Sequence, residues 1–259
     1  MAIKRTRNND KDLLIELVKA RFKLRYNNSI LGFVWVLLKP FSYFMILYFV
    51  FSAVQVGPKD ENFAANLFIG LIMYLFFLEG ITFGMNSLLD MASVILKINF
   101  PRHIAVLSSL VMAMINLSVN FIVVIIIAVS LHFHPHLIGT LYCLAVIGVE
   151  VMLIYGISMI LSIVLIRIRD LTHIMELFFQ LLFYASAVFY SFDSIQGATG
   201  AIIRLNPLAI MIDAARKGFI LNQIEHVQEM LIIFIVAVAI IIVGRIFFNR
   251  RIKRVAEYF

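Results

Sequence analysis

Six apolar stretches, divided by short polar segments, occupy most of this chain and constrain its fold more than any other feature. A helix needs roughly 20 apolar residues to cross about 30 Å of hydrocarbon. The stretches also lack the alternation of a transmembrane β-strand, so helices must satisfy the backbone in lipid. The sequence therefore predicts an all-α polytopic membrane protein with one domain, residues 1–259. The predicted transmembrane helices are 32–55, 64–87, 103–131, 137–166, 172–191 and 227–248.

The composition independently indicates a lipid environment. Hydrophobic residues make up 63% of the chain and charged residues 14%, whereas soluble domains have about 25% charged residues. The first apolar run starts after about 30 residues and is too long for the core of a secretory signal, so we expect no cleavable signal peptide. Cys143 is the only cysteine, which excludes an intrachain disulfide.

The basic residues predict the orientation in the membrane. Most of the 22 Lys and Arg residues lie before the first stretch, between the second and third, between the fourth and fifth, and after the sixth. By the positive-inside rule, these segments and both termini are cytoplasmic. The net charge of +7 then reflects orientation and lipid headgroups rather than nucleic acid, because the basic residues are spread over four juxtamembrane segments.

Residues 10–30 precede the first predicted span and are too polar to cross a membrane. Plotted as a helix, they place Asp12, Glu16, Lys19 and Lys23 on one face, with apolar residues around most of the rest. Long basic side chains can lay their stems along the membrane boundary. The pattern therefore favours an amphipathic helix lying in the membrane interface. A solvated basic leader is the alternative.

The second cytoplasmic segment, residues 88–101, is more apolar than a solvated connector. We expect a short helix that ends before Pro101, because the residue before a proline avoids the helical region. Apolar surface on a cytoplasmic segment favours a protein partner. Alternatively, its apolar residues extend the second span.

The sequence holds no GxxxxGK[ST] phosphate loop and no glycine-rich turn that opens a helix around nucleotide phosphates. If the protein uses the energy of ATP, another chain must hydrolyse it.

Four motifs resemble, in order, landmarks of the permease subunits of ABC-2 type polysaccharide exporters, which handle O-antigen, teichoic acid and capsular chains. The motifs are RYNNSILGFVWVLLKP (Arg25 to Pro40), LKINFPRH (Leu96 to His103), IRDLTHIMELFFQLLFYASAVFYS (Ile168 to Ser191) and NPLAIMIDAARKGF (Asn206 to Phe219). Together they reach from the first span to the last loop.

The resemblance implies a transport subunit rather than an enzyme, in the bacterial cytoplasmic membrane. It implies a homodimer joined to two copies of a separate ATP-binding subunit, with ATP and Mg on that partner and no cofactor on this chain. The substrate would be a lipid-linked glycan, and no nucleic acid is involved. Residues 192–225 would form short helices near the outer surface, some re-entering the membrane. The residues expected to contact the ATPase are Asp12, Glu16, Lys19, Lys23, Asp90, Lys97 and Pro101.

Aromatic residues concentrate in the first and fifth predicted spans. Rings can stack on the C–H faces of sugars and phenols can bond hydroxyls, so an aromatic channel would let a glycan slide without tight binding. Lipid-facing or interfacial positions are the alternative for any single ring. The candidates for lining a channel, chosen by helical period, are Phe44, Tyr48, Phe51, Phe179, Phe183 and Tyr190.

Charged residues in or beside the spans have two interpretations each. Glu79 and Glu150 lie inside predicted spans, where we favour a structural role, through hydrogen bonds or a partner such as Lys39, over a proton relay. The basic residues beside the spans either contact a lipid headgroup or gate, or simply anchor the helices at the interface. These residues are Arg25, Arg167 and Arg169.

Three histidines alternate around Pro135, namely His132, His134 and His136. The missing fourth ligand argues against a metal site, and a solvated turn is the simpler account.

Three other functions remain to be weighed. An exporter of drugs or small lipids would share this architecture. A membrane-embedded lipid-modifying enzyme would need clustered polar groups at one membrane face, whereas this sequence offers scattered carboxylates. A passive channel or secondary carrier would transport without any ATPase.

Overall fold

The structure is a computed structural model that describes residues 7–26, 31–54, 62–92, 100–130, 136–191 and 197–252. Within these ranges every regular element is a helix, as predicted. The elements are α1 (Arg7–Tyr26), η1 (Gly32–Val34), α2 (Trp35–Val54), α3 (Phe63–Asp90), α5 (His103–Ser130), α6 (Leu137–Arg167), α7 (Leu171–Ala185), α8 (Gly197–Arg204), α9 (Pro207–Arg216), the π-helical η3 (Lys217–Leu221) and α10 (Val227–Arg251).

Among the residues that the structure describes, five helices are long and apolar enough to cross a membrane: α2 with its preceding turn, α3, α5, α6 and α10. The remaining predicted span, 172–191, corresponds to α7, which has 15 residues and ends at Ala185. At 1.5 Å per residue α7 is about 22 Å long, short of the roughly 30 Å of a hydrocarbon core. The prediction of a helix continuing to residue 191 is therefore wrong, and the chain turns after Ala185.

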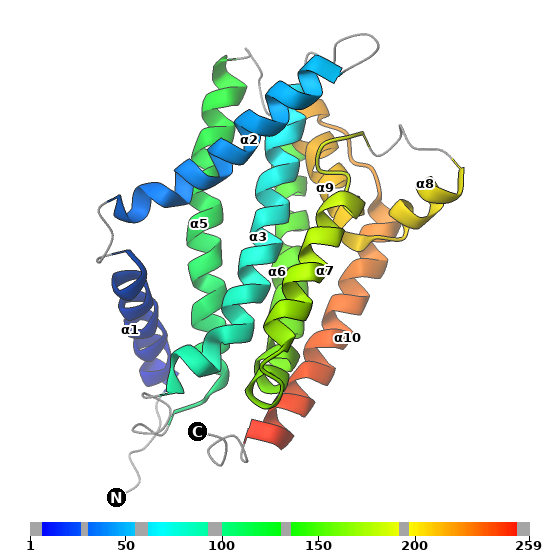
Figure 1. The fold of residues 1–259 in the computed structure, drawn as a ribbon. Helices are drawn as coiled ribbons and strands as arrows, with labels where there is room; N and C mark the ends of the chain where they lie inside the picture. The colour runs from blue at the N-terminus through cyan, green and yellow to red at the C-terminus, as the bar shows by residue number, and fades with distance from the viewer. Residues whose placement is uncertain are drawn as a thin grey trace, which may run out of the picture.

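Helix α3 is the centre of the bundle and packs against α5 and α6, while α10 packs along the other side of α6 (Figure 1). Small residues allow these helices to approach closely, as is common in membrane bundles. A Cβ added to Gly244 of α10 would lie 2.8 Å from the carbonyl oxygen of Gly156 in α6, and one added to Gly84 of α3 would lie 2.2 Å from Oγ of Ser158. Larger side chains at either glycine would push the helices apart.

Helix α2 crosses the outside of α5 and α3 (Figure 1). Among its residues whose side chains the structure describes, only Val36, Pro40 and Phe44 are buried. Their spacing of four places them on one face of the helix. Helix α2 thus presents one narrow stripe to the bundle and leaves most of its apolar surface uncovered.

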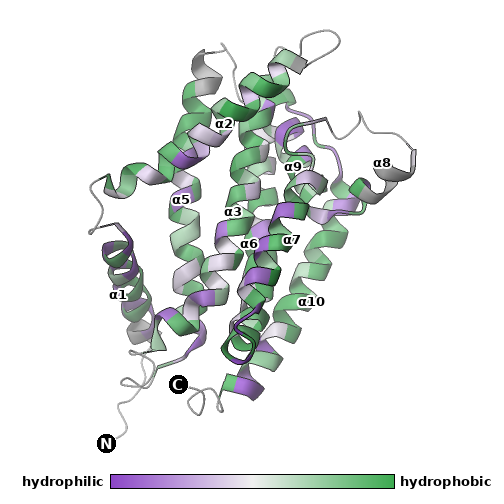
Figure 2. Ribbon diagram, viewed as in Figure 1, coloured by the Kyte–Doolittle hydropathy of each residue, from purple (hydrophilic) through white to green (hydrophobic). Residues whose placement is uncertain are grey.

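The two ends of the bundle differ in chemistry. Helices α3 and α10 end, α5 begins and α6 turns into α7 at the lower end in Figure 1, and α8 and α9 lie toward the other end. Apolar residues dominate α10, whereas hydrophilic residues gather on α1, at the lower helix ends and around α9 (Figure 2). We call the lower end the basic end, after Arg102, Arg167, Arg169, Arg250 and Arg251.

Helix α1 spans Arg7–Tyr26 and so covers residues 10–26 of the predicted interfacial segment 10–30, whose residues 27–30 lie outside the described part. It packs against α5 near the basic end. Leu17 is buried in a cluster with Leu88 and Met91 at the end of α3 and Ile104 at the start of α5. Helix α1 is therefore attached to the bundle.

The structure resolves the two remaining predicted segments in part. In segment 88–101, residues 88–90 complete α3, while Lys97 falls in the undescribed stretch 93–99. In segment 192–225, residues 192–196 lie outside the description, and α8, α9 and η3 occupy most of the rest.

Candidate functional site

Most of the predicted channel-lining rings lie in an aromatic row, which we define as Phe44, Tyr48, Phe51, Phe189, Phe183 and Tyr74. In α2, Phe44 stacks on Tyr48 with ring centroids 5.6 Å apart. One turn further on, Phe51 stacks on Phe189 at 4.7 Å. The C-terminal half of α2 is thereby joined to the segment that follows α7.

The aromatic row continues from that segment into the bundle. Phe189 contacts Phe183 at 5.7 Å, and Phe183 meets Tyr74 of α3 edge-on at 5.0 Å. The Tyr74 hydroxyl donates a 2.5 Å hydrogen bond to the carbonyl of Phe179. The row therefore connects α2, α3 and α7 through rings and one backbone bond.

The six predicted rings differ in accessibility. Phe44 and Phe179 are buried, at 7% and 5% exposure, and contact other rings inside the subunit. Tyr48, Phe51, Phe183 and Tyr190 are partly exposed. Only these four lie at the surface of this conformation.

Beside the aromatic row, Arg216 of α9 lies 6% exposed in the bundle. Its Nε donates to the carbonyl of Asn66 in α3 at 2.7 Å. Its Nη1 donates to the carbonyl of Ala187 at 2.7 Å and to that of Tyr190 at 3.5 Å. Its Nη2 donates to the carbonyl of Val188 at 2.6 Å. One guanidinium therefore binds the backbone of α3 and of the turn after α7. We call this arrangement the Arg216 clamp.

The Arg216 clamp stabilises the turn that follows α7. Carbonyls at a helix C-terminus lack helical partners, and here side chains from α9 supply donors. Nδ2 of Asn206 donates to the carbonyl of Ala185 at 2.9 Å, and the Asn206 side chain also accepts from the amide of Leu208 to cap α9. The turn after α7 and the start of α9 therefore stabilise each other.

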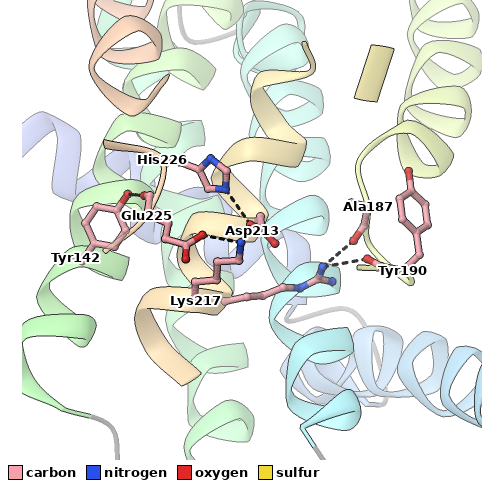
Figure 3. A network of polar contacts seen from close by, with 8 residues as sticks. Tyr142, Ala187, Tyr190, Asp213, Lys217, Glu225 and His226 are labelled. Atoms are coloured by element: carbon pink, nitrogen blue, oxygen red, sulfur yellow. Dashed lines mark hydrogen bonds and ion pairs between the residues drawn. The ribbon is translucent and has the colours of Figure 1, made fainter. Parts of the chain in front are cut away.

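A second polar cluster surrounds Asp213, one turn before Arg216 (Figure 3). Asp213 lies 3.0 Å from Nζ of Lys217 and 2.9 Å from Nε2 of His226. Lys217 also contacts Glu225 at 2.7 Å, and the Tyr142 hydroxyl donates to the Glu225 carbonyl. These contacts connect α9, η3, the start of α10 and the start of α6.

Asp213, Arg216 and Lys217 belong to the motif Asn206 to Phe219, but none of them was predicted as a site residue. A usable signal was present, because Asp213, Arg216 and Lys217 recur at helical spacing inside an apolar segment. Charges in such a position are costly unless they are paired.

At the basic end, Arg21 holds α1 against α3. Its Nη2 donates to the carbonyl of Ser87 at 2.9 Å, and its Nη1 lies 3.5 Å from Asp90. Burial lowers the pKa of Arg21 and Asp90 opposes that effect, yet an arginine stays protonated in proteins. Asp90, predicted to contact an ATPase, thus already pairs within the subunit. Arg25 lies 3.9 Å above the ring of Phe83, a cation–π contact.

The other residues predicted to meet a partner or a headgroup lie mostly on the surface. Asp12, Glu16, Lys19 and Lys23 are exposed on α1, and Lys19 pairs with Glu16 at 2.9 Å. Arg167 and Arg169 are exposed at the turn between α6 and α7, and Pro101 lines a cavity at the start of α5.

The two carboxylates within the spans have different surroundings. Glu79 accepts a 2.8 Å hydrogen bond from Asn116, which in turn accepts from Tyr26 of α1 at 3.0 Å. The described structure shows no ion pair between Glu79 and Lys39. Glu150 is fully buried, and neither carboxyl oxygen has a hydrogen-bond partner among the described residues. The predicted hydrogen-bonding role therefore fits Glu79 and not Glu150.

Within the described residues, no group of three or more potential ligands is placed to hold a metal ion. His136 is exposed before α6, while His132 and His134 belong to the undescribed stretch 131–135.

Comparison with known proteins gives one consistent answer. Residues 12–220 match the ABC-2 type transporter family. The O-antigen export system permease protein RfbA of Klebsiella pneumoniae is 30% identical to this chain, over 95% of this chain and 94% of its own length. A protein of the same name from Myxococcus xanthus is 24% identical over the same shares.

Proposed function

We propose that this chain is the membrane subunit of an ATP-driven exporter of a lipid-linked polysaccharide. The chain belongs to the ABC-2 type transporter family. The observation that carries this proposal is the 30% identity to an O-antigen export permease along nearly the whole chain. The name of that relative refers to O-antigen export, which supports a polysaccharide as the substrate.

The energy would come from a partner. The sequence holds no phosphate loop, so two copies of a separate ATP-binding subunit, with ATP and Mg, would serve a homodimer of this chain. By the positive-inside rule, the basic end and both termini would lie in the cytoplasm of a bacterium. The exposed charged face of α1, with Asp12, Glu16, Lys19 and Lys23, would then contact the ATPase.

Helix α3 offers a route for force from the ATPase to the opposite end. Arg21 of α1 binds the last turn of α3 at Ser87 and Asp90. The first turn of α3 is held by the Arg216 clamp through Asn66. The 28 residues of α3 span about 42 Å, so a tilt imposed through α1 would move the clamp and the turn after α7.

The glycan would pass between two copies, along the uncovered surface of α2 and α7. Only Phe179 of α7 is buried among its residues, and the exposed rings include Phe178 and Tyr184. The partly exposed members of the aromatic row join these helices near the clamp. Their rings would give a sliding glycan many weak and similar contacts instead of one tight site.

Loss and restoration of surface glycan test the proposal. In a bacterium lacking this protein, the lipid-linked glycan should accumulate inside and disappear from the surface, and the intact chain should restore export. Replacing Phe183 and Tyr190 with alanine should reduce restoration while leaving protein levels unchanged. Unaltered surface glycan in the deletion strain, with altered drug sensitivity, would instead support a drug exporter.

A further inference from the structure

A cavity of about 700 Å³ opens at the basic end, between the start of α5, the middle of α6 and the last turns of α10. It lies apart from the aromatic row, the Arg216 clamp and the charged face of α1. None of the sequence predictions assigned a ligand to it, although Pro101 lines it. Its polar lining comes from Arg102, His103, Tyr155, Arg245 and Asn249.

The charged side chains that line the cavity are all basic. Arg102, His103 and Arg245 are the basic residues, and none of the described residues that line the cavity carries a carboxylate. Nη1 of Arg102 donates to the carbonyl of Ile252, which fixes that side chain at the cavity wall. Arg245 is exposed, with no ion pair among the described residues. An anion in the cavity would therefore meet two guanidinium groups and a phenol.

The remaining wall is apolar, with Phe100, Met159, Phe248 and Ile252. Arg245 is also the first charged residue after the long apolar run of α10, so the cavity lies where that helix leaves the apolar part of the membrane. A cavity with a cationic side and an apolar side, at that depth, suits an amphiphile whose headgroup is anionic. Arginine favours phosphate because its planar fork binds two oxygens at once.

We propose that this cavity binds the phosphate or pyrophosphate headgroup of a membrane lipid, with Arg245 and Arg102 as its contacts. The apolar wall would hold the first part of the lipid chain. The inference rests on the proposed function in one respect only: if the chain exports a lipid-linked glycan, the bound lipid phosphate is where the substrate is held before transport.

Binding to the purified full-length chain, without any ATPase, tests the site. Farnesyl pyrophosphate supplies a lipid-borne pyrophosphate, inorganic pyrophosphate a free one, and phosphatidylglycerol nanodiscs a bulk anionic lipid. Arg245→Gln should weaken farnesyl pyrophosphate binding about tenfold or more, as expected for a lost charge-assisted contact. The affinity of Arg245→Lys for farnesyl pyrophosphate should lie between those of the unaltered chain and Arg245→Gln. The matched control is Arg250→Gln, an exposed arginine of the same helix that does not line the cavity.

Each outcome decides a part of the proposal. Equal loss in the Arg245→Gln and Arg250→Gln variants, or loss in neither, would overturn the site. Inorganic pyrophosphate binding as tightly as farnesyl pyrophosphate would overturn the requirement for a lipid. Phosphatidylglycerol binding that also depends on Arg245 would support the site and identify bulk lipid as a ligand. Because no transport is measured, failure here leaves the export proposal standing, and failed export leaves this result unchanged.

Discussion

At the scale of single residues, Arg216 is predicted to be the least replaceable side chain. Arg216→Gln would leave carbonyls of α3 and of the turn after α7 buried without donors. We expect a loss on the order of 3 kcal/mol, or about 6 to 12 °C in Tm measured in detergent. Arg216→Lys should recover only part, because an ammonium lacks the planar fork. An unchanged Tm in Arg216→Gln would contradict the clamp.

A glycine substitution tests the same clamp without touching the arginine. A Cβ added to Gly70 of α3 would lie 2.0 Å from Nη2 of Arg216, whereas one added to Gly148 of α6 meets nothing within 4 Å. Gly70→Ala should therefore lower the Tm as Arg216→Lys does. Gly148→Ala, the matched control in another helix, should leave it unchanged or slightly raised.

Replacing Glu150, in contrast to Arg216, is predicted to raise the Tm. It is fully buried and neither oxygen has a hydrogen-bond partner in the described structure, so the polar group costs stability where it lies. Glu150→Leu should raise the Tm by about 2 °C or more and leave export intact. Glu150→Gln, which stays polar, should give little change. Export abolished by both substitutions, with normal assembly, would show that the carboxyl acts in transport.

At the scale of elements, α1 carries two kinds of residue with separable roles. Arg21→Gln removes the contacts to Ser87 and Asp90 and should lower both the Tm and the co-purification of the ATPase. Lys23→Gln alters only an exposed side chain and should reduce co-purification at an unchanged Tm. The two readouts are thermal unfolding and the ATPase recovered per permease. Full co-purification in both variants would exclude α1 as the ATPase contact.

The long helices were predictable because the length of each apolar stretch in the sequence indicates a helix that can cross a membrane. The predicted start of α5 at residue 103, of α6 at 137 and of α10 at 227 agree with the structure. The short helices expected within residues 192–225 include α9, which begins at Pro207 with Asn206 as its cap. By contrast, the apolar run beyond Ala185 reads as a continuing helix, and the contacts that Asn206 and Arg216 make with the turn come from residues distant in sequence.

The site residues were less predictable for a related reason. Arg216 binds backbone carbonyls, which every residue possesses. The sequence therefore contains no complementary side chain from which its partners could be predicted. Helical period correctly grouped Phe44 with Tyr48. Period alone could not tell that Phe44 faces Phe68 inside the bundle instead of an open surface.

At the scale of the whole molecule, the uncovered surface of α2 and α7 is predicted to face a second copy. In a Cys143→Ser background, which removes the only cysteine, Tyr184→Cys should give a crosslinked dimer with a short bismaleimide reagent in membranes. Ile242→Cys, similarly exposed but on α10, is the control and should remain monomeric. The reverse pattern would place the dimer contact on α10 and remove α2 and α7 from the path.

We propose that this chain is the membrane half of an ATP-driven polysaccharide exporter and transports nothing without its ATP-binding partner. The most direct measurement places the purified chain in proteoliposomes with a lipid-linked glycan, with and without its ATP-binding partner, and follows the glycan reaching the opposite leaflet. We predict transport only when the partner and hydrolysable ATP are both present. Equal transport by the chain alone would contradict this account and indicate a passive channel or a secondary carrier.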